Sequence, residues 1–422
     1  MKHNLLLFAT LFFSISLSGQ SNWTHFRGSA LNGIADDSIY PVSWNDSTNI
    51  EWFIPVEGRA WSSPVVYGNQ VWLTSASVDG KEMFVLCLDL ESGNEIYHIN
   101  LFNPDTVYGK HAVNTYATPT AAIEDGYVYV HFGRYGTACI NTSTGEKVWE
   151  RTDMQCNHVQ GPGSSLFIYE NKLIVHMEGT DVQDIYALDK KTGLTIWKAS
   201  RNNNFYKALK DIGKKAYVTP IVIDVDGRKL MISNGSAVCN AYDIETGEEV
   251  WYIVQGEDST ISMPVEYEGK IYFYTSFITP EEGERYCELW CVDPKGEGDL
   301  TENILWRKKS AELQLLTPVI KDGLLYTVDT RGVLYCLDAE DGTIIWQEKL
   351  KGKYNSSPVI AGDHVYISST RGDTYVFKTG LTYQLLVENK LPGEIWATPA
   401  FVDGAILMRT SKGLYKIVEK KQ

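Results

Sequence analysis

Short apolar segments separated by Gly-containing turns recur along the chain from about residue 50 onward. The copy over residues 317–346 shows the unit most clearly, because it begins with Thr317-Pro318 and ends at Trp346. Its apolar segments are 319–320, 324–328, 333–338 and 344–346, and its turns contain Gly323 and Gly342. Short apolar runs bounded by turn residues are typical of antiparallel strands. The pattern predicts a repeating unit of four antiparallel β-strands.

Eight such units follow one another. Most of them start with Ser or Thr followed by Pro, at Pro64, Pro119, Pro220, Pro318, Pro358 and Pro399. Met263-Pro264 and Ser165-Leu166 take this place in two looser copies. The mean period of about 48 residues lies in the range of propeller blades. We therefore expect an all-β fold, an eight-bladed β-propeller of four-stranded antiparallel blades over residues 49–418.

The N-terminal part of this region predicts how the ring closes. Residues 49–54 resemble a closing strand, and Trp52 precedes Pro64 by the same 12 residues that separate Trp306 from Pro318. The eighth copy, residues 398–417, has three strands and no fourth. The N-terminal strand is therefore expected to complete the last blade, so that no sheet edge stays open.

A Gly-x-x-x-Trp sequence closes many of the units. It stands at Gly145/Trp149, Gly193/Trp197, Gly247/Trp251 and Gly342/Trp346. A large apolar side chain that recurs at one repeat position is better explained by packing between blades than by a cofactor site.

Residues 1–20 are expected to be a signal peptide. Lys2 precedes an apolar stretch over residues 5–17, which is too short to span a bilayer, and small residues follow it. Because of this length we expect no membrane anchor, and because no cysteine follows until Cys87 we expect no lipid-modified N-terminus. The sequence predicts a periplasmic or secreted protein with an N-terminal extension over residues 21–48 before the propeller.

The seven cysteines are expected to be mostly free and buried. Cys87, Cys291 and Cys336 each stand before an apolar residue and Asp, at equivalent positions of different repeats. Such positions lie too far apart for a disulfide. Cys156 has no such repeat role.

The repeat resembles the family of propellers named for pyrroloquinoline quinone (PQQ). The resemblance is carried by the segment Ala187–Trp197, with its apolar-Asp, Thr-Gly and terminal Trp. The opening Asn22–Gly28, with Trp44 and Trp52, is similar to exported quinoprotein-like propellers. The family also includes quinone-dependent alcohol and sugar dehydrogenases and the lipoprotein propeller that helps assemble outer-membrane barrels.

The strand polarity of a blade predicts where a ligand would bind. The residues before each Ser/Thr-Pro anchor, and the turns between second and third strands, should ring one mouth of the central channel. The segments before the anchors include 59–61, 114–116, 157–160, 214–217, 354–355 and 394–396. The turns add His131, His176, Glu178, Asp181, Arg409 and Lys412.

A set of Arg and aromatic residues on this rim forms the candidate binding site. Its members are Arg59, Trp61, Tyr116, Arg134, Arg331, Arg371 and Trp396. The planar guanidinium group suits a carboxylate or sulfate, so we expect an anionic ligand. The alternative is that Arg331 and Arg371 are merely solvated turn residues.

Charge and motif content limit the function classes. The 53 acidic residues outnumber the 38 basic ones, which gives a net charge of −15 and argues against nucleic-acid binding. No close His/Cys/Asp/Glu spacing indicates a metal site, and Glu178 with Asp181 is only a weak calcium candidate. The quinone dehydrogenases in the family use adjacent cysteines, which this chain lacks, and no catalytic residue can be assigned.

These observations favour a binding module over an enzyme. The expected partner is an anionic small molecule, PQQ or an anionic polysaccharide among them, or a partner protein, bound by a monomer. Calcium is expected only if the quinone binds. The alternatives are a PQQ-dependent oxidoreductase acting on alcohols or sugars and, less favoured, an outer-membrane assembly scaffold.

Overall fold

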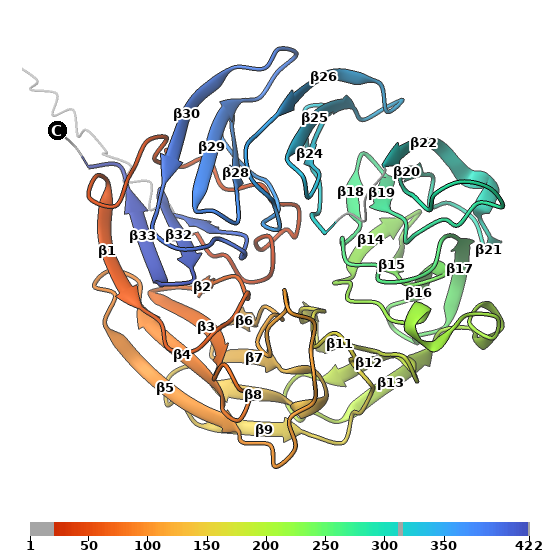
Figure 1. The fold of residues 1–422 in the computed structure, drawn as a ribbon. Helices are drawn as coiled ribbons and strands as arrows, with labels where there is room; N and C mark the ends of the chain where they lie inside the picture. The colour runs from red at the N-terminus through yellow and green to blue at the C-terminus, as the bar shows by residue number, and fades with distance from the viewer. Residues whose placement is uncertain (1–20, 311–314, 421–422) are drawn as a thin grey trace, which may run out of the picture.

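Eight antiparallel β-sheets stand radially around a central axis in the computed structural model, which describes residues 21–310 and 315–420 (Figure 1). The predicted signal peptide lies outside the described residues. The predicted eight-bladed propeller is confirmed. No helix in the described part of the chain is both long and apolar enough to cross a membrane.

The first four blades follow the chain in order. Blade 1 contains β2 (Val65–Tyr67), β3 (Gln70–Ala76), β4 (Met83–Asp89) and β5 (Glu95–Phe102). Blade 2 contains β6 (Ala122–Glu124), β7 (Tyr127–His131), β8 (Thr137–Asn141) and β9 (Lys147–Arg151). Blade 3 contains β10 (Phe167–Tyr169), β11 (Lys172–Glu178), β12 (Gln183–Asp189) and β13 (Thr195–Ser200). Blade 4 contains β14 (Ile221–Val225), β15 (Arg228–Asn234), β16 (Val238–Asp243) and β17 (Glu249–Val254).

The next three blades repeat the arrangement. Blade 5 contains β18 (Val265–Tyr267), β19 (Lys270–Tyr274), β20 (Cys287–Val292) and β22 (Ile304–Ser310). Blade 6 contains β23 (Val319–Lys321), β24 (Leu324–Val328), β25 (Val333–Asp338) and β26 (Ile344–Lys349). Blade 7 contains β27 (Val359–Ala361), β28 (His364–Ser368), β29 (Asp373–Lys378) and β30 (Leu385–Lys390). The short β21 (Gly298–Asp299) adds a fifth, parallel strand to blade 4. The residues that the structure describes also form four single-turn 3-10 helices: η1 (Gly133–Tyr135), η2 (Asn203–Phe205), η3 (Asp211–Gly213) and η4 (Thr301–Asn303).

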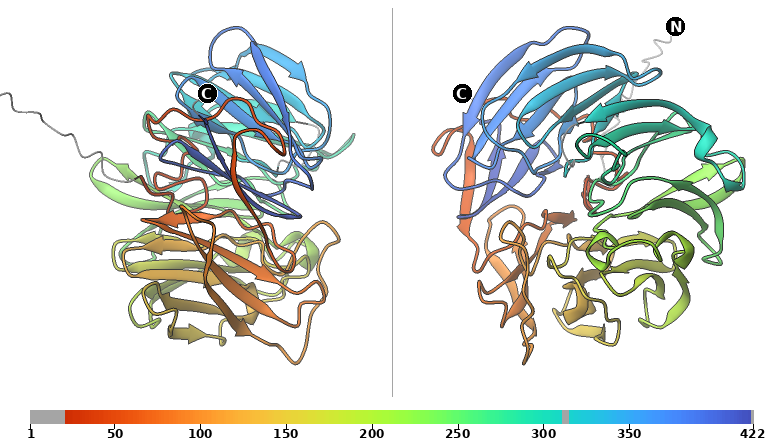
Figure 2. Two further views of the ribbon diagram at one scale, coloured as in Figure 1. Left: turned by 90° about the vertical axis from the view of Figure 1, so that its left-hand side faces the viewer. Right: turned by 45° about the vertical axis from the view of Figure 1, so that its right-hand side comes forward.

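The eighth blade joins the two ends of the propeller, as predicted. It contains β31 (Ala400–Val402), β32 (Ala405–Thr410) and β33 (Gly413–Val418), and β1 (Ile50–Pro55) supplies its outer strand. β1 pairs antiparallel with β33, with Ile54 opposite Leu414. Both views of Figure 2 show the orange-red β1 beside the blue C-terminal strands. The ring is closed by main-chain hydrogen bonds.

The recurrent Trp residues pack between blades, as predicted. The indole of Trp149 in blade 2 donates a hydrogen bond to the carbonyl oxygen of Lys190 in blade 3 at 2.9 Å, and Trp197 bonds Ile244 in blade 4 at 3.0 Å. Each indole also covers the Gly of the next blade's turn, so closely that a Cβ at Gly193 would lie 2.8 Å from Trp149. The Gly-x-x-x-Trp pattern therefore encodes the contact between neighbouring blades.

The N-terminal extension passes through the centre of the propeller. Trp23 exchanges main-chain hydrogen bonds with Val66 of β2, Ile123 of β6 donates to the carbonyl oxygen of Thr24, and Gly33 accepts from Ile360 of β27. These partners belong to the innermost strands of blades 1, 2 and 7. In Figure 1 the red trace of the extension runs across the centre of the ring. The extension thus covers the channel on the side of the turns between first and second strands.

The cysteines are free and buried at all seven positions, as predicted. Burial raises the pKa of the Cys291 and Cys336 thiols to about 11. Cys156, which has no repeat role, lies with its Sγ 3.0 Å from Nε2 of His158.

Candidate functional site

The opposite end of the channel contains a cavity of about 370 Å³. The segments that connect the last strand of one blade to the first strand of the next, called links below, line it at all eight blade junctions. Phe26 is the lining residue contributed by the N-terminal extension. Because the extension covers the far end of the channel, Phe26 forms part of the cavity floor. The cavity is a blind pocket on the face where the sequence predicted ligand binding.

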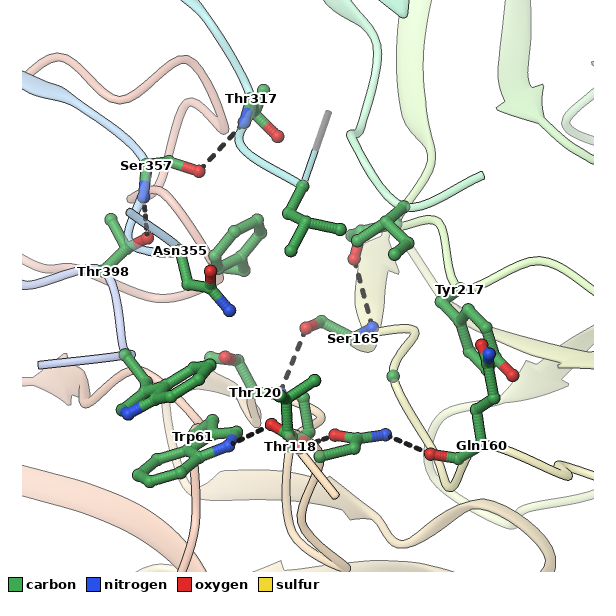
Figure 3. A pocket seen from close by; sticks show the side chains of 18 of the residues that line it. Trp61, Thr118, Thr120, Gln160, Ser165, Tyr217, Thr317, Asn355, Ser357 and Thr398 are labelled. Atoms are coloured by element: carbon green, nitrogen blue, oxygen red, sulfur yellow. Dashed lines mark hydrogen bonds between the residues drawn. The ribbon is translucent and has the colours of Figure 1, made fainter. Parts of the chain in front are cut away.

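A ring of hydroxyl groups surrounds this pocket. The amide of Ser63 donates to Thr120 Oγ1 at 3.0 Å, and the amide of Thr120 donates to Ser165 Oγ at 3.0 Å. The same bond recurs from Ser165 to Thr219, from Met263 to Thr317, from Thr317 to Ser357 and from Ser357 to Thr398, at 3.0–3.1 Å. Figure 3 shows several of these bonds. We call the hydroxyls of Thr120, Ser165, Thr219, Thr317, Ser357 and Thr398 the hydroxyl ring.

The hydroxyl ring explains the Ser/Thr-Pro anchors. The residue before an anchor Pro connects neighbouring blades through its amide, its side-chain oxygen or, at Thr317 and Ser357, both, whereas Pro needs no amide partner. Met263 interrupts the ring because it has no hydroxyl to accept the amide proton of Thr219. The Ser and Thr at the anchors were visible in the sequence, but their side chains were not recognised there as pocket residues.

Two stacked indoles stand at the mouth of the pocket. The ring centroids of Trp61 and Trp396 are 4.9 Å apart with an interplanar angle of 13°. The Arg59 guanidinium lies over Trp61, 4.9 Å from the ring centroid. Trp61 is further held by a hydrogen bond of 2.9 Å from its Nε1 to the carbonyl oxygen of Val113. These links bring blades 7, 8 and 1 together on one aromatic wall.

The insert before blade 2 forms the next wall. Asn114 Nδ2 donates to the carbonyl oxygens of Gln160 and Pro162, at 2.8 and 3.0 Å. Its Oδ1 accepts the hydroxyl proton of Thr118 at 2.5 Å. Figure 3 shows this side of the pocket, with Gln160 and Tyr217 beyond Thr118. The two loops therefore hold each other in place across the blade 2–3 junction.

The described lining contains no Asp, Glu, Lys or Arg side chain. Its polar groups are hydroxyls, the amides of Asn114, Gln160 and Asn355, and the imidazole of His111. The pocket is therefore neutral at its surface, polar around its circumference and aromatic at its mouth.

Known proteins share this fold and repeat. A family model described as "Outer membrane protein assembly factor BamB" matches residues 181–289 and 288–385. The chain is a PQQ-like β-propeller. Among curated relatives of this PQQ-like propeller, tetrathionate hydrolase of Acidithiobacillus ferrooxidans is 24% identical over 82% of this chain and 72% of its own. The assembly factor BamB of Yersinia pestis is 22% identical over 67% and 66%.

Solved structures support the same fold. BamB from Moraxella catarrhalis matches with a TM-score of 0.60 and 13% identity, over 87% of this chain and 98% of its own. Quinohemoprotein alcohol dehydrogenase from Comamonas testosteroni matches with a TM-score of 0.66 and 12% identity, over 95% and 81%. At such identities the likeness concerns the fold alone.

The structure brings together only part of the predicted site of this PQQ-like propeller. Trp61 and Trp396 line the pocket, with Arg59 against Trp61. Arg331 and Arg371 are exposed in the turns before β25 and β29, outside the pocket lining. Their part in binding stays a prediction.

Tyr116 and Arg134 lie in a second, much smaller cavity of about 10 Å³. The Arg134 guanidinium stacks on Tyr108, 3.7 Å from the ring centroid, and His158 also lines this space. These two residues therefore belong to a site separate from the central pocket.

Some turn residues near the predicted rim are buried between blades instead. Glu178 receives two hydrogen bonds of 2.8 Å from Arg201 and lies 3.1 Å from Nδ1 of His176. Burial alone would raise the pKa of Glu178, but Arg201 and His176 outweigh it and lower the pKa to about 2. Asp181 accepts the amide of Asn157. Glu178 thus serves an ion pair, which leaves little reason to assign it to calcium.

The described lining offers the quinone no direct ion pair. It holds no Lys or Arg side chain that could contact the carboxylates of PQQ. No group of three or more His, Cys, Asp or Glu able to hold a metal ion occurs among the described residues. The stacked indoles would suit a flat ring, but the polar groups match hydroxyl-bearing ligands better.

Proposed function

We propose that this exported PQQ-like propeller is a binding protein that holds a saccharide in its central pocket. The observation that carries the proposal is the hydroxyl ring below the Trp61–Trp396 stack in a blind cavity of about 370 Å³. Such a volume lies in the usual range for small-ligand pockets. Sugars combine C–H faces, which pack on aromatic rings, with hydroxyls that both donate and accept.

The hydrogen-bonding state of the ring supports this ligand class. Each ring hydroxyl accepts one amide proton from the preceding blade. A hydroxyl has one proton of its own to donate, and the described residues around the ring offer that proton no acceptor. Ligand oxygens would satisfy these donors, as buried polar groups require.

Titration of the purified protein with a panel of neutral and acidic oligosaccharides by isothermal calorimetry tests the proposal. We expect binding, and a loss of at least about tenfold in Kd for Trp61→Ala, equal to about 1.4 kcal/mol. Thr398→Val should also weaken binding, because it removes a ring donor. Thr343→Val, on an exposed outer turn, is the control and should bind like the parent.

Failure of every oligosaccharide to bind, or parent-like binding by Trp61→Ala, would contradict the proposal. The double variant Arg331→Ala/Arg371→Ala belongs in the same titration, since it tests the exposed arginines predicted from the sequence. Tetrathionate should be included as a small anion, because a relative named for its hydrolysis aligns with 82% of this chain.

The oxidoreductase alternative has its own test. The protein is titrated with PQQ and calcium while its absorbance is followed, and the mixture is then offered an alcohol or a sugar with a dye. A stoichiometric complex that reduces the dye would favour the alternative over the proposal.

A further inference from the structure

Two buried arginines next to the pocket differ from every other buried charge of the described residues. Arg27 and Arg409 are almost completely inaccessible, with exposed fractions of 0% and 4%. No carboxylate of the described residues lies within ion-pair distance of either guanidinium. The other buried Lys, Arg, Asp and Glu side chains all have an oppositely charged partner: Lys172–Glu245, Glu178–Arg201, Asp184–Lys198, Lys215–Asp258 and Lys416–Glu91.

Arg27 stands directly behind the pocket on the side of blades 6 and 7. Its guanidinium donates to the carbonyl oxygens of Pro318 at 2.7 Å, Thr317 at 3.1 Å and Pro358 at 3.2 Å. Thr317 belongs to the hydroxyl ring, and Phe26, the neighbour of Arg27, lies in the floor. The Arg27 charge is therefore separated from the pocket by residues of its lining, Phe26 and Thr317.

Arg409 holds the corresponding place between blades 8 and 1. Its Nη1 donates to Ser62 Oγ at 2.7 Å, to the carbonyl oxygen of Thr74 at 2.9 Å and to that of Ser62 at 3.2 Å. Ser62 follows Trp61 of the aromatic wall in the chain. Both arginines thus bind the main chain of the links that line the pocket, from different sides of the channel.

Both groups keep their charge at neutral pH. Burial lowers the pKa of Arg27 to about 9 and that of Arg409 to about 10, and both values remain above 7. Carbonyl dipoles solvate a buried cation only in part, and an unpaired buried charge is costly. Its field also reaches farther than that of a surface charge, because walls of low dielectric screen it weakly.

We propose that Arg27 and Arg409 make the central pocket selective for an anion, so that its ligand is an acidic saccharide rather than a neutral one. That the ligand is a saccharide rests on the proposed function. That it is negatively charged rests on the two unpaired arginines. At the mouth, exposed Arg59 and Glu394 contribute one charge of each sign. Asp258, which accepts the hydroxyl proton of the lining residue Ser259, is paired with Lys215. The proposed excess of positive charge therefore comes from Arg27 and Arg409 behind the lining. This position for the charge differs from the exposed rim predicted from the sequence.

The sign of the potential is measured without any natural ligand. Asn355→Cys places one thiol in the pocket lining, while the seven native cysteines are buried. Its rates of alkylation by iodoacetate, an anion, and iodoacetamide, its neutral analogue, are compared with those of Leu381→Cys, at a position that is 70% exposed. The ratio of the two rates cancels the reactivity of the thiol itself.

We expect the iodoacetate-to-iodoacetamide ratio in the pocket to exceed that of the exposed reference by about tenfold. Arg27→Gln or Arg409→Gln in the Asn355→Cys background should lower the ratio, whereas Arg228→Gln, at an exposed ion pair, should leave it unchanged. If Asn355→Cys, with both arginines intact, gives the same rate ratio as Leu381→Cys, the inference is overturned. This comparison does not depend on the folding of an arginine variant.

A matched pair of ligands separates the two proposals. Oligogalacturonate and the neutral galactose oligomer of the same length are titrated by calorimetry, and we expect the acid to bind at least about tenfold more tightly at low salt. Equal binding of both overturns the anion inference and leaves the saccharide proposal standing. Binding of neither, with a high alkylation ratio, contradicts the saccharide proposal and leaves the anion-selective pocket standing.

Discussion

The indole Nε1 of Trp52 donates a hydrogen bond of 3.1 Å to the carbonyl oxygen of Leu90. Trp52 belongs to β1 in blade 8, and Leu90 follows β4 in blade 1. The same contact joins blade 2 to blade 3 through Trp149 and Lys190. The junction that closes the ring therefore uses the packing of an ordinary blade junction, although it joins two distant parts of the chain.

Replacing Trp52 by Ala should destabilise the protein by about 3–5 kcal/mol, as expected for removing a buried Trp. The indole is 9% exposed and covers Gly93 of blade 1. Urea denaturation followed by circular dichroism measures the change. Trp149→Ala is the matched control within the ring, and we expect a smaller loss because Trp149 is only partly buried. A midpoint for Trp52→Ala equal to that of the parent would refute this account of closure.

Removing residues 21–56 should abolish cooperative thermal unfolding. The deletion takes away β1 and leaves β33 with an unpaired edge, and it also removes the extension that covers the channel. A shorter deletion of residues 21–35 keeps β1, so it should still melt in one transition, at a lower temperature. Calorimetry distinguishes the two outcomes. A sharp transition of the longer deletion at the parent temperature would be incompatible with closure by β1.

Gly247→Ala should cost more stability than Gly269→Ala. Both glycines have a positive φ, of +74° and +75°, so both variants meet the same backbone strain. A Cβ at Gly247 would lie 2.6 Å from Trp197, whereas nothing lies within 4 Å of one at Gly269. We expect an extra loss of about 1–3 kcal/mol for Gly247→Ala, from overpacking. Equal urea midpoints for the two variants would contradict the prediction, because they would show that Trp197 can move away from a Cβ at Gly247 without loss of stability.

The free energy of unfolding should decrease as the pH falls below about 6.5. Burial lowers the pKa of His25 to about 4 and that of His131 to about 3, compared with about 6.5 in an unfolded chain. The unfolded state therefore binds more protons below pH 6.5, so the stabilising effect of the neutral rings is complete above that pH and is lost toward pH 4.

His25→Gln tests this dependence at one residue. Its Nε2 accepts the amide proton of Ile168, which a protonated ring could not do. The variant should reduce the slope of the unfolding free energy between pH 6.5 and 4.5 by up to about 1.4 kcal/mol per pH unit. Thr343→Val, at an exposed side chain that does not titrate, should keep the parent slope. An unchanged slope for His25→Gln would show that this ring does not contribute.

Repeat spacing was enough to predict the blades and their closure. Most blades use the same local packing, a Gly turn covered by an indole of the preceding blade, so the same residues recur at a regular spacing in the sequence. Trp52 could be assigned to the last blade because its distance to Pro64 equals that between Trp306 and Pro318. The packing role of these residues followed from their size and recurrence alone.

Only the tertiary structure decided which side chains share the pocket and where its charge lies. Trp61 and Trp396 are 335 positions apart, and their stacking depends on how the ring closes. Arg331 and Arg371 lie in turns between second and third strands, and no residue of the described lining comes from such a turn. Arg27 stands in an extension without repeat character, so no spacing indicated that it would lie behind the pocket floor. A sequence repeat determines contacts between neighbouring blades, because similar contacts recur at most junctions. The pocket on the axis is instead lined by residues from all eight junctions and by Phe26 of the N-terminal extension, so it exists only once the ring has closed.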